Sequence, residues 1–128
     1  MAVSLGLSRS GPVEADYSDG VCFEDDGYYW FLYPFFEEAC KQTGQMIDPY
    51  GDAIFEPVHL PALLAVLEEA ARSAEQQPEE WDVRLGWRGG QEVYCKVSKR
   101  KVQGMLTDFI ALVKGAMAAG KNVVGYGD

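Results

Sequence analysis

Carboxylates are the side chains of this sequence with the greatest capacity for chemistry, and they gather ahead of a run of aromatic residues. Five lie between positions 16 and 26, and two bracket a turn: Asp16, Asp19, Glu24, Asp25, Asp26, Asp48 and Asp52. Paired carboxylates can act as general acid and base or bind a divalent cation. The stretch from Glu24 to Gly27 lacks the ligand spacing of a calcium-binding loop. We therefore expect solvated charge here, with no metal site and no catalytic residue.

Other motifs for catalysis or cofactor binding are absent from the chain. His59 is the only histidine, so a zinc site or a histidine-based nucleophile relay would lack its partners. The glycines form neither G-x-G-x-x-G nor G-x-x-x-x-G-K, and G-x-S-x-G does not occur. Three cysteines without a C-x-x-C pair are expected to be small buried side chains. The sequence predicts a protein that is not an enzyme and has no cofactor.

The acidic charge is confined to one half of the chain. The 128 residues carry a net charge of −9, which argues against nucleic acid or an anionic membrane as the partner. Residues 1–64 hold 11 acids and two bases, whereas residues 65–128 hold nine of each. The first half also contains the aromatic run YYWFLYPFF at 28–36.

Aromatic anchors surrounded by charge are typical of a protein-binding face, because rings supply contact area and charge steers the encounter. We therefore expect the seven acids named above to bind a cationic protein together with Tyr28, Tyr29 and Trp30. The alternative is that the rings belong to the core and the acids only keep the protein soluble. A second charged group, Lys99-Arg100-Lys101, stands at the start of a predicted helix. It is a candidate anion site or a basic rim that pairs with the acidic half. A third alternative is that the preceding strand runs past Lys99.

The elements that position these residues follow from hydrophobic period and turn residues. Short strands are expected at 3–7, at a sheet edge, and at 21–23, with a turn at 18–20 between them. Because Pro34 suits the first turn of a helix, a helix is expected from near Tyr33 to just before Gly44. A turn at 48–51 is flanked by short strands at 45–47 and 53–55. Apolar stripes predict helices at 61–77 and 100–119, the latter capped by Ser98 and closed by Gly120, with a last strand at 122–126.

Two alternating stretches between the last two helices predict a β-hairpin. A two-residue turn at Gly89-Gly90 would place the two apolar sets on opposite sides. We therefore expect a three-residue loop, 89–91, which pairs Leu85 with Cys95 and Trp87 with Val93. Together the elements predict one α+β domain over residues 1–128, with a mostly antiparallel sheet and about three helices packed on it.

Small acidic domains of this kind, without a catalytic motif, resemble the immunity proteins of bacterial toxin systems. The resemblance lies in overall character and in stretches such as YYWFLYPFFEEACKQTGQMIDPYGDAIFEP. It implies a bacterial protein that occludes the cationic surface of a toxin domain. No signal peptide is recognisable, so a cytoplasmic location is expected. Three other classes stay open: a self-assembling subunit that forms a homodimer through the aromatic segment, a small-anion binder at 99–101, and a carboxylate enzyme.

Overall fold

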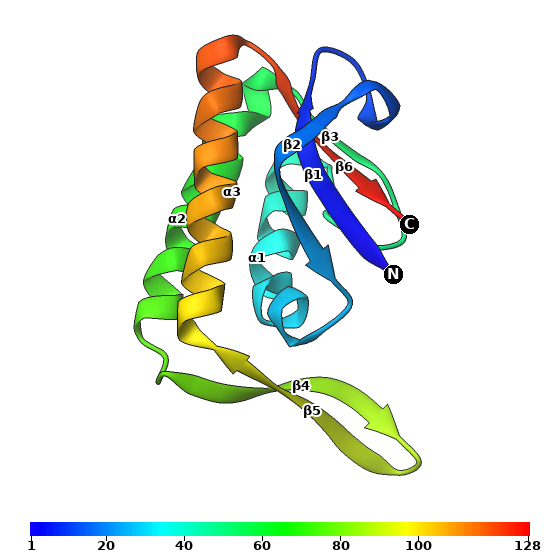
Figure 1. Cartoon of the computed structure of the whole chain (residues 1–128), viewed down its shortest axis with the longest axis vertical. Coiled ribbons are helices and arrows are strands. Elements are labelled where there is room, and N and C mark those ends of the chain that lie inside the picture. Colours follow the sequence, from blue (N-terminus) through cyan, green and yellow to red (C-terminus); the bar gives the residue numbers. More distant parts are fainter.

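Four strands form an antiparallel sheet beside a layer of three helices (Figure 1). The computed structural model describes all 128 residues. The sheet order is β2-β1-β6-β3, with bounds Asp16–Glu24, Ala2–Ser8, Asn122–Gly127 and Ala53–Phe55. The helices are α1 (Gly27–Thr43), α2 (Leu60–Glu75) and α3 (Lys99–Ala119), and 3-10 turns lie at Pro12–Glu14 and Pro57–His59. The predicted α+β class is confirmed.

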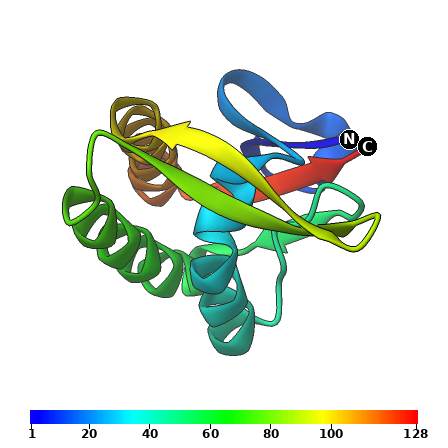
Figure 2. The same ribbon diagram turned by 90° about the horizontal axis from the view of Figure 1, so that it is seen from below.

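A separate two-stranded hairpin, β4 (Glu80–Arg88) and β5 (Gln91–Ser98), joins α2 to α3. It lies across the end of the helical layer where α1 and α3 begin, and its turn reaches past the helices (Figures 1 and 2). Its base is held by Trp81, whose ring meets Phe31 of α1 edge to face at 5.1 Å between centroids. We call residues 80–98 the hairpin arm.

The core lies between the sheet and the helices. Alternate residues of the strands face it, so Val3 and Leu5 of β1 are fully buried, while Ser4 and Ser8 lie on the other face of the sheet. Phe23 of β2 lies 5.6 Å from the ring of Phe36 in α1 and 5.9 Å from that of Phe109 in α3. Each such side chain contributes roughly 1.5–3 kcal/mol on burial. These rings therefore join the sheet to both helices.

The start of α1 differs from the sequence prediction. The helix begins at Gly27, because the Asp26 side chain accepts hydrogen bonds from the backbone N–H groups of Tyr28 (2.9 Å) and Tyr29 (3.4 Å). Pro34 lies inside the helix and is exposed, so the Trp30 carbonyl that loses its donor is on the solvent side. The cap outweighs this cost. The predicted end is confirmed, since Gly44 has φ +80° and closes the helix.

The later elements follow the sequence prediction more closely. The structure confirms α2, α3 and β6, with ends within about two residues of those expected. The Ser98 hydroxyl accepts from the Lys101 N–H at 3.4 Å, and Gly120 closes α3 with φ +65°. The turn at 48–51 is present, with the Gly51 N–H donating to the Asp48 carbonyl at 3.2 Å.

Three expectations about strands are wrong. β1 pairs with β2 on one side and β6 on the other, so it is an inner strand and not an edge. Residues 18–20 belong to β2, where the register shift opposite Leu5 and Leu7 absorbs the turn-like residues. Residues 45–47 form no strand, although the Gln45 side chain accepts from the Ile54 N–H at 2.9 Å.

The register of the hairpin arm is also different. Arg88 pairs with Gln91 across a two-residue Gly89-Gly90 turn, and both glycines have positive φ, as a tight hairpin turn requires. A bulge between Arg84 and Gly86 then shifts the register by one residue. The three-residue loop is wrong: Cys95 pairs with Val83 and Val93 with Gly86. The bulge, and not the turn, keeps Trp81 and Val83 on the face of Val93, Cys95 and Val97, while Trp87 passes to the other face.

Two further properties bear on function. The cysteines are free, and none is fully buried: Cys22 is exposed, while Cys40 and Cys95 are half-buried.

By length and hydropathy alone α3 could cross a membrane. Many core helices share this property, and the apolar stripe of α3 here packs on the core.

Candidate functional site

A small hollow opens beside the first two turns of α1, where the loop that follows the helix returns to it. Its volume is about 190 Å³. It is lined by two acids, four aromatic rings and two further apolar side chains: Asp25, Tyr29, Trp30, Tyr33, Met46, Asp48, Pro49 and Tyr50. We call it the aromatic pocket. It unites residues separated by up to 25 positions in the sequence.

Asp25 is the polar centre of the aromatic pocket. Its Oδ1 accepts from the indole Nε1–H of Trp30 at 2.8 Å, and its Oδ2 accepts from the hydroxyl of Tyr50 at 2.9 Å. The hydrogen bond to Asp25 raises the pKa of Tyr50 above its usual value. Asp48 Oδ1 accepts from the Tyr50 N–H at 2.9 Å, which holds the loop in its turn.

Three of the four rings of the aromatic pocket, those of Tyr29, Trp30 and Tyr33, are in mutual contact. The Trp30 and Tyr33 centroids are 4.9 Å apart, and Tyr29 meets Trp30 nearly edge to face at 5.3 Å. The Tyr29 hydroxyl donates to the Ile47 carbonyl at 2.7 Å, so it ties the loop to the helix. Burial raises the pKa of Tyr29, and the nearby Asp48 raises it further. The pocket is therefore preformed on a core-anchored helix.

Local sequence places these groups. Trp30 and Tyr33 are three residues apart, so they lie on one face of α1. Gly27 lets the first turn of α1 approach β5 closely, since a Cβ there would lie 2.7 Å from a methyl carbon of Val97 and 3.0 Å from Cys95. Asp26 caps the helix. The acidic stretch 24–26 thus has three different surroundings, of which only that of Asp25 contributes to the pocket.

The three predicted aromatic anchors also have different surroundings. Trp30 is 36% exposed and borders the pocket, whereas Tyr29 is 2% exposed and belongs to the core. The Tyr28 hydroxyl accepts from the Ser98 N–H at 3.1 Å, and the Lys101 ammonium lies 4.6 Å from its ring centroid. Tyr28 therefore links α1 to the start of α3, and Trp30 is the most exposed of the three rings.

The remaining predicted acids are dispersed. Asp16 accepts from the Ser18 hydroxyl and N–H at 2.6 and 2.9 Å, and these bonds lower its pKa. Asp52 accepts from the Gly127 N–H at 3.3 Å. Asp19 lines a different hollow beside α3, and Glu24 is exposed at the end of β2. Of the seven acids, the structure brings only Asp25 and Asp48 into the aromatic pocket.

The three predicted anion-binding bases have separate neighbours. The Lys99 ammonium donates to the Glu75 carbonyl at 2.8 Å, and Lys101 faces Tyr28. Lys99 and Arg100 line one hollow, but Glu79 and Glu80 line it too, which weakens the field for an anion. An anion site at 99–101 stays a prediction.

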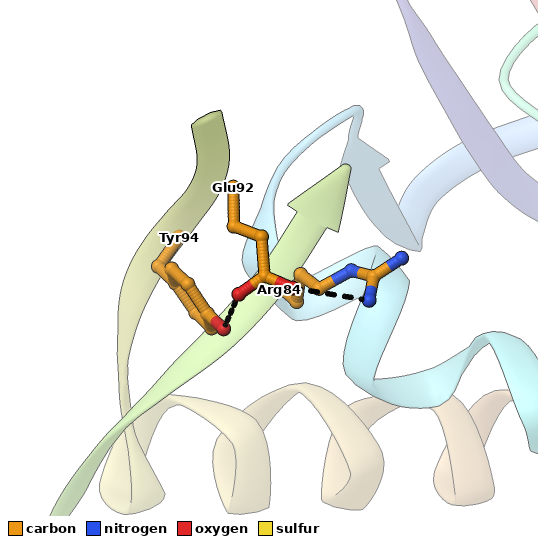
Figure 3. A network of polar contacts seen from close by, with 3 residues as sticks. All are labelled: Arg84, Glu92 and Tyr94. Carbon is orange, nitrogen blue, oxygen red and sulfur yellow. Dashed lines mark hydrogen bonds and ion pairs between the residues drawn. The ribbon is translucent and has the colours of Figure 1, made fainter. Parts of the chain in front are cut away.

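The sequence prediction missed a second exposed aromatic surface, on the hairpin arm. Trp87 is 64% exposed and Tyr94 is 52% exposed. Glu92 accepts from the Tyr94 hydroxyl and pairs with Arg84 at 3.5 Å, as Figure 3 shows. The bulge places Trp87 on the same face as Arg84, whose guanidinium lies 6.0 Å from the ring centroid of Trp87. Simple alternation along the strand predicts Trp87 on the core side.

Charge is distributed unevenly along the chain. Residues 84–101, which comprise the outer part of the hairpin arm and the start of α3, hold six bases and one acid, a net of +5. The rest of the chain holds five bases and 19 acids, a net of −14. Only two ion pairs form, Arg72–Glu69 and Arg84–Glu92. No base therefore neutralises the carboxylates of the aromatic pocket.

Larger hollows exist, but they lack such converging groups. One of about 520 Å³ runs between β2 and α3, and one of about 590 Å³ lies between α2 and α3 with acids and bases mixed. Neither has an aromatic side chain in its lining. The aromatic pocket can bind and orient a small cationic group. Comparison with protein-family models, curated proteins and solved structures finds no match for this chain.

Proposed function

We propose that this chain is a non-catalytic binding module of the immunity type, which occludes the cationic surface of a toxin domain. The aromatic pocket is the anchor of the contact, and the acidic part of the surface steers the partner onto it. In such a complex the carboxylates take the position of an anionic substrate of the toxin. The cytoplasm of a bacterial cell is where the chain acts in this proposal.

One observation carries the proposal: two carboxylates without a basic partner border exposed ring surface in a preformed hollow. Tryptophan and tyrosine are frequent energetic anchors of interfaces because they bury much area at low entropic cost. Unpaired acids raise the encounter rate with a basic protein. Both features favour capture of a cationic protein over catalysis on a small substrate.

The proposal predicts that the reading frame beside this gene encodes a cationic toxic domain. Co-expression of this chain is then expected to restore growth of cells that make that domain. Failure of rescue, or a neighbouring product without affinity for this chain, would overturn the proposal.

Association kinetics with that domain test the steering. In the variant Glu24→Gln/Asp25→Asn/Asp48→Asn, we expect the association rate to fall about tenfold at low salt, with a weaker salt dependence. The amides are close in shape to the acids they replace, so the pocket is retained. The matched control Glu68→Gln/Glu75→Gln/Glu79→Gln removes the same charge from the region of α2, where these side chains are exposed and make no hydrogen bond. Equal slowing in both variants would show that the association rate depends on net charge alone and not on the carboxylates beside the pocket.

Self-assembly is the second candidate, and the exposed Trp87 and Tyr94 favour it. A two-fold symmetric contact would bring the basic tip of each hairpin arm to the acidic face of the other copy. Sedimentation velocity separates the candidates, because the immunity-type proposal requires a monomer that is free to meet its partner. A stable dimer that dissociates on Arg88→Gln would favour self-assembly.

A further inference from the structure

We infer that the aromatic pocket is a receptor for one guanidinium group, supplied by an arginine side chain of the partner. This inference rests on the proposed function for the source of the arginine, but the chemistry belongs to the pocket itself. It narrows the contact from a general acidic face to a single site around Asp25, Trp30 and Tyr33.

The carboxylate at the centre has capacity left for a cation. Asp25 accepts one neutral donor on each oxygen, from Trp30 and from Tyr50. A carboxylate has about four lone-pair positions, so each oxygen can accept one more hydrogen bond. A guanidinium presents two parallel N–H groups, which match the two oxygens of a carboxylate. The bonds from Trp30 and Tyr50 orient Asp25 without neutralising it.

The rings supply the second requirement. A guanidinium is attracted to the face of an aromatic ring within about 6 Å, most strongly to tryptophan. Trp30 and Tyr33 are 4.9 Å apart with planes inclined by 37°, and both border the pocket that Asp25 and Asp48 make negative. Cation–ring attraction and ionic attraction therefore act on the same group.

The volume of the pocket limits what can enter. Sites for drug-sized ligands measure roughly 300–1,000 Å³, whereas this hollow measures about 190 Å³. A side-chain head group fits, and a nucleotide does not. An anionic ligand is disfavoured by Asp25 and Asp48, and a bare metal ion would find two carboxylates and no third ligand, as no cluster of three metal-binding side chains exists.

The indole N–H signal of Trp30 in a ¹H–¹⁵N spectrum reports on the site, because this N–H is bonded to Asp25. The variant Trp30→Phe identifies the signal among those of the three tryptophans. We expect N-acetyl-arginine methylamide to shift it with millimolar saturation. The lysine analogue should bind several-fold more weakly, because an ammonium cannot form the paired hydrogen bonds. The citrulline analogue, which has a urea of the same shape without charge, should not bind.

Variants separate the pocket from general surface charge. We expect Asp25→Asn and Tyr33→Leu each to weaken arginine-amide binding about fivefold. The controls Asp82→Asn and Tyr94→Leu remove an acid and a ring from the hairpin arm and should leave it unchanged. Tyr29 is left intact because it is part of the core.

Three results would overturn the inference: equal shifts with the arginine and citrulline amides, equal affinity for the lysine amide, or equal loss in the pocket variants and the controls. The experiment needs no toxin, so its failure is distinguishable from failure of the proposed function. Growth rescue without arginine-amide binding would contradict the guanidinium site but not the immunity-type function. Arginine-amide binding without rescue would support the guanidinium site and contradict the immunity-type function.

Discussion

The aromatic pocket and the hairpin arm use the same local device in different settings. In each, a tyrosine hydroxyl donates to a carboxylate that a second donor also binds: Tyr50 to Asp25 with Trp30, and Tyr94 to Glu92 with Arg84 (Figure 3). In the pocket the second donor is neutral, so the carboxylate keeps its charge. On the hairpin arm the second donor is a guanidinium, so the charge is compensated.

The supports of the two regions differ as well. The aromatic pocket joins a helix to a loop through the buried Tyr29, whereas the outer part of the hairpin arm is held by its own two strands. An isolated two-stranded hairpin is marginally stable in water. The comparison contrasts an acidic receptor anchored on the core with an arm of balanced charge, since residues 80–98 hold three acids and three bases. The predictions below address this contrast.

The largest effect on stability is expected where α1, the helix that carries the aromatic pocket, contacts the hairpin arm. Gly27→Ala places a Cβ against Val97 and Cys95, at 2.7 and 3.0 Å. We expect the free energy of unfolding to fall by about 2–3 kcal/mol, although alanine favours helices, because the first turn of α1 must move off β5. Urea denaturation measures this change.

Gly104→Ala and Gly115→Ala are the matched controls in α3. A Cβ at either position meets nothing within 4 Å. Each should stabilise the protein by about 0.5–1 kcal/mol through helix propensity alone. If Gly27→Ala stabilised the protein as the controls do, the close contact between α1 and β5 would not contribute to the free energy of unfolding.

A smaller and local effect is expected in the hairpin arm. Gly86 has φ +142° at the bulge, a conformation that side chains rarely adopt. Gly86→Ala should cost about 1–2 kcal/mol in the opening free energy of amides 84–93 and return Trp87 toward the core-facing side. Native-state hydrogen exchange measures it, and core amides of β1 and β6 serve as the reference. Equal loss in arm and core would show that the arm is not an independent unit.

The predictability of these two regions from sequence differs for physical reasons. Where one signal dominates, as in the stripes of α2 and α3, the elements were predicted almost to their ends. Where a second, unconsidered signal acts, the prediction fails. At α1 the proline rule predicts a start near Tyr33, but the Asp26 cap starts the helix at Gly27. In the hairpin arm the choice between a two-residue and a three-residue turn favours the longer loop, but a bulge within β4 sets the register. A bulge has no reliable sequence mark beyond a glycine in a strand.

The aromatic pocket was predictable only in part. Asp25, Trp30 and Asp48 were named from charge and ring content, but Tyr50 and Met46 join them through the path of a loop that no periodicity describes. Tyr29 is buried in the core although it was expected at the binding face. An aromatic run indicates ring content, but the sequence alone does not say which rings of the helix face the core.

The smallest effect is a titration that tells the two tyrosines apart. The hydrogen bonds to Asp25 and Glu92 raise the pKa of Tyr50 and of Tyr94 above the usual value of 10. A raised pKa in the folded state favours the neutral phenol. The associated stability is therefore complete below pH 10 and is lost as the pH rises through the raised value. Asp25→Asn and Glu92→Gln should each return the pKa of one tyrosine toward 10, as measured by tyrosinate absorbance.

An arginine amide sharpens this comparison. A cation in the aromatic pocket favours the tyrosinate, so the pKa of Tyr50 should fall when the amide binds. The pKa of Tyr94 should not respond, because Arg84 already occupies the corresponding place beside Glu92 and lowers that pKa. Tyr50→Phe and Tyr94→Phe assign the two transitions. A shift of both tyrosines, or of neither, would contradict the difference between an open receptor and a compensated pair.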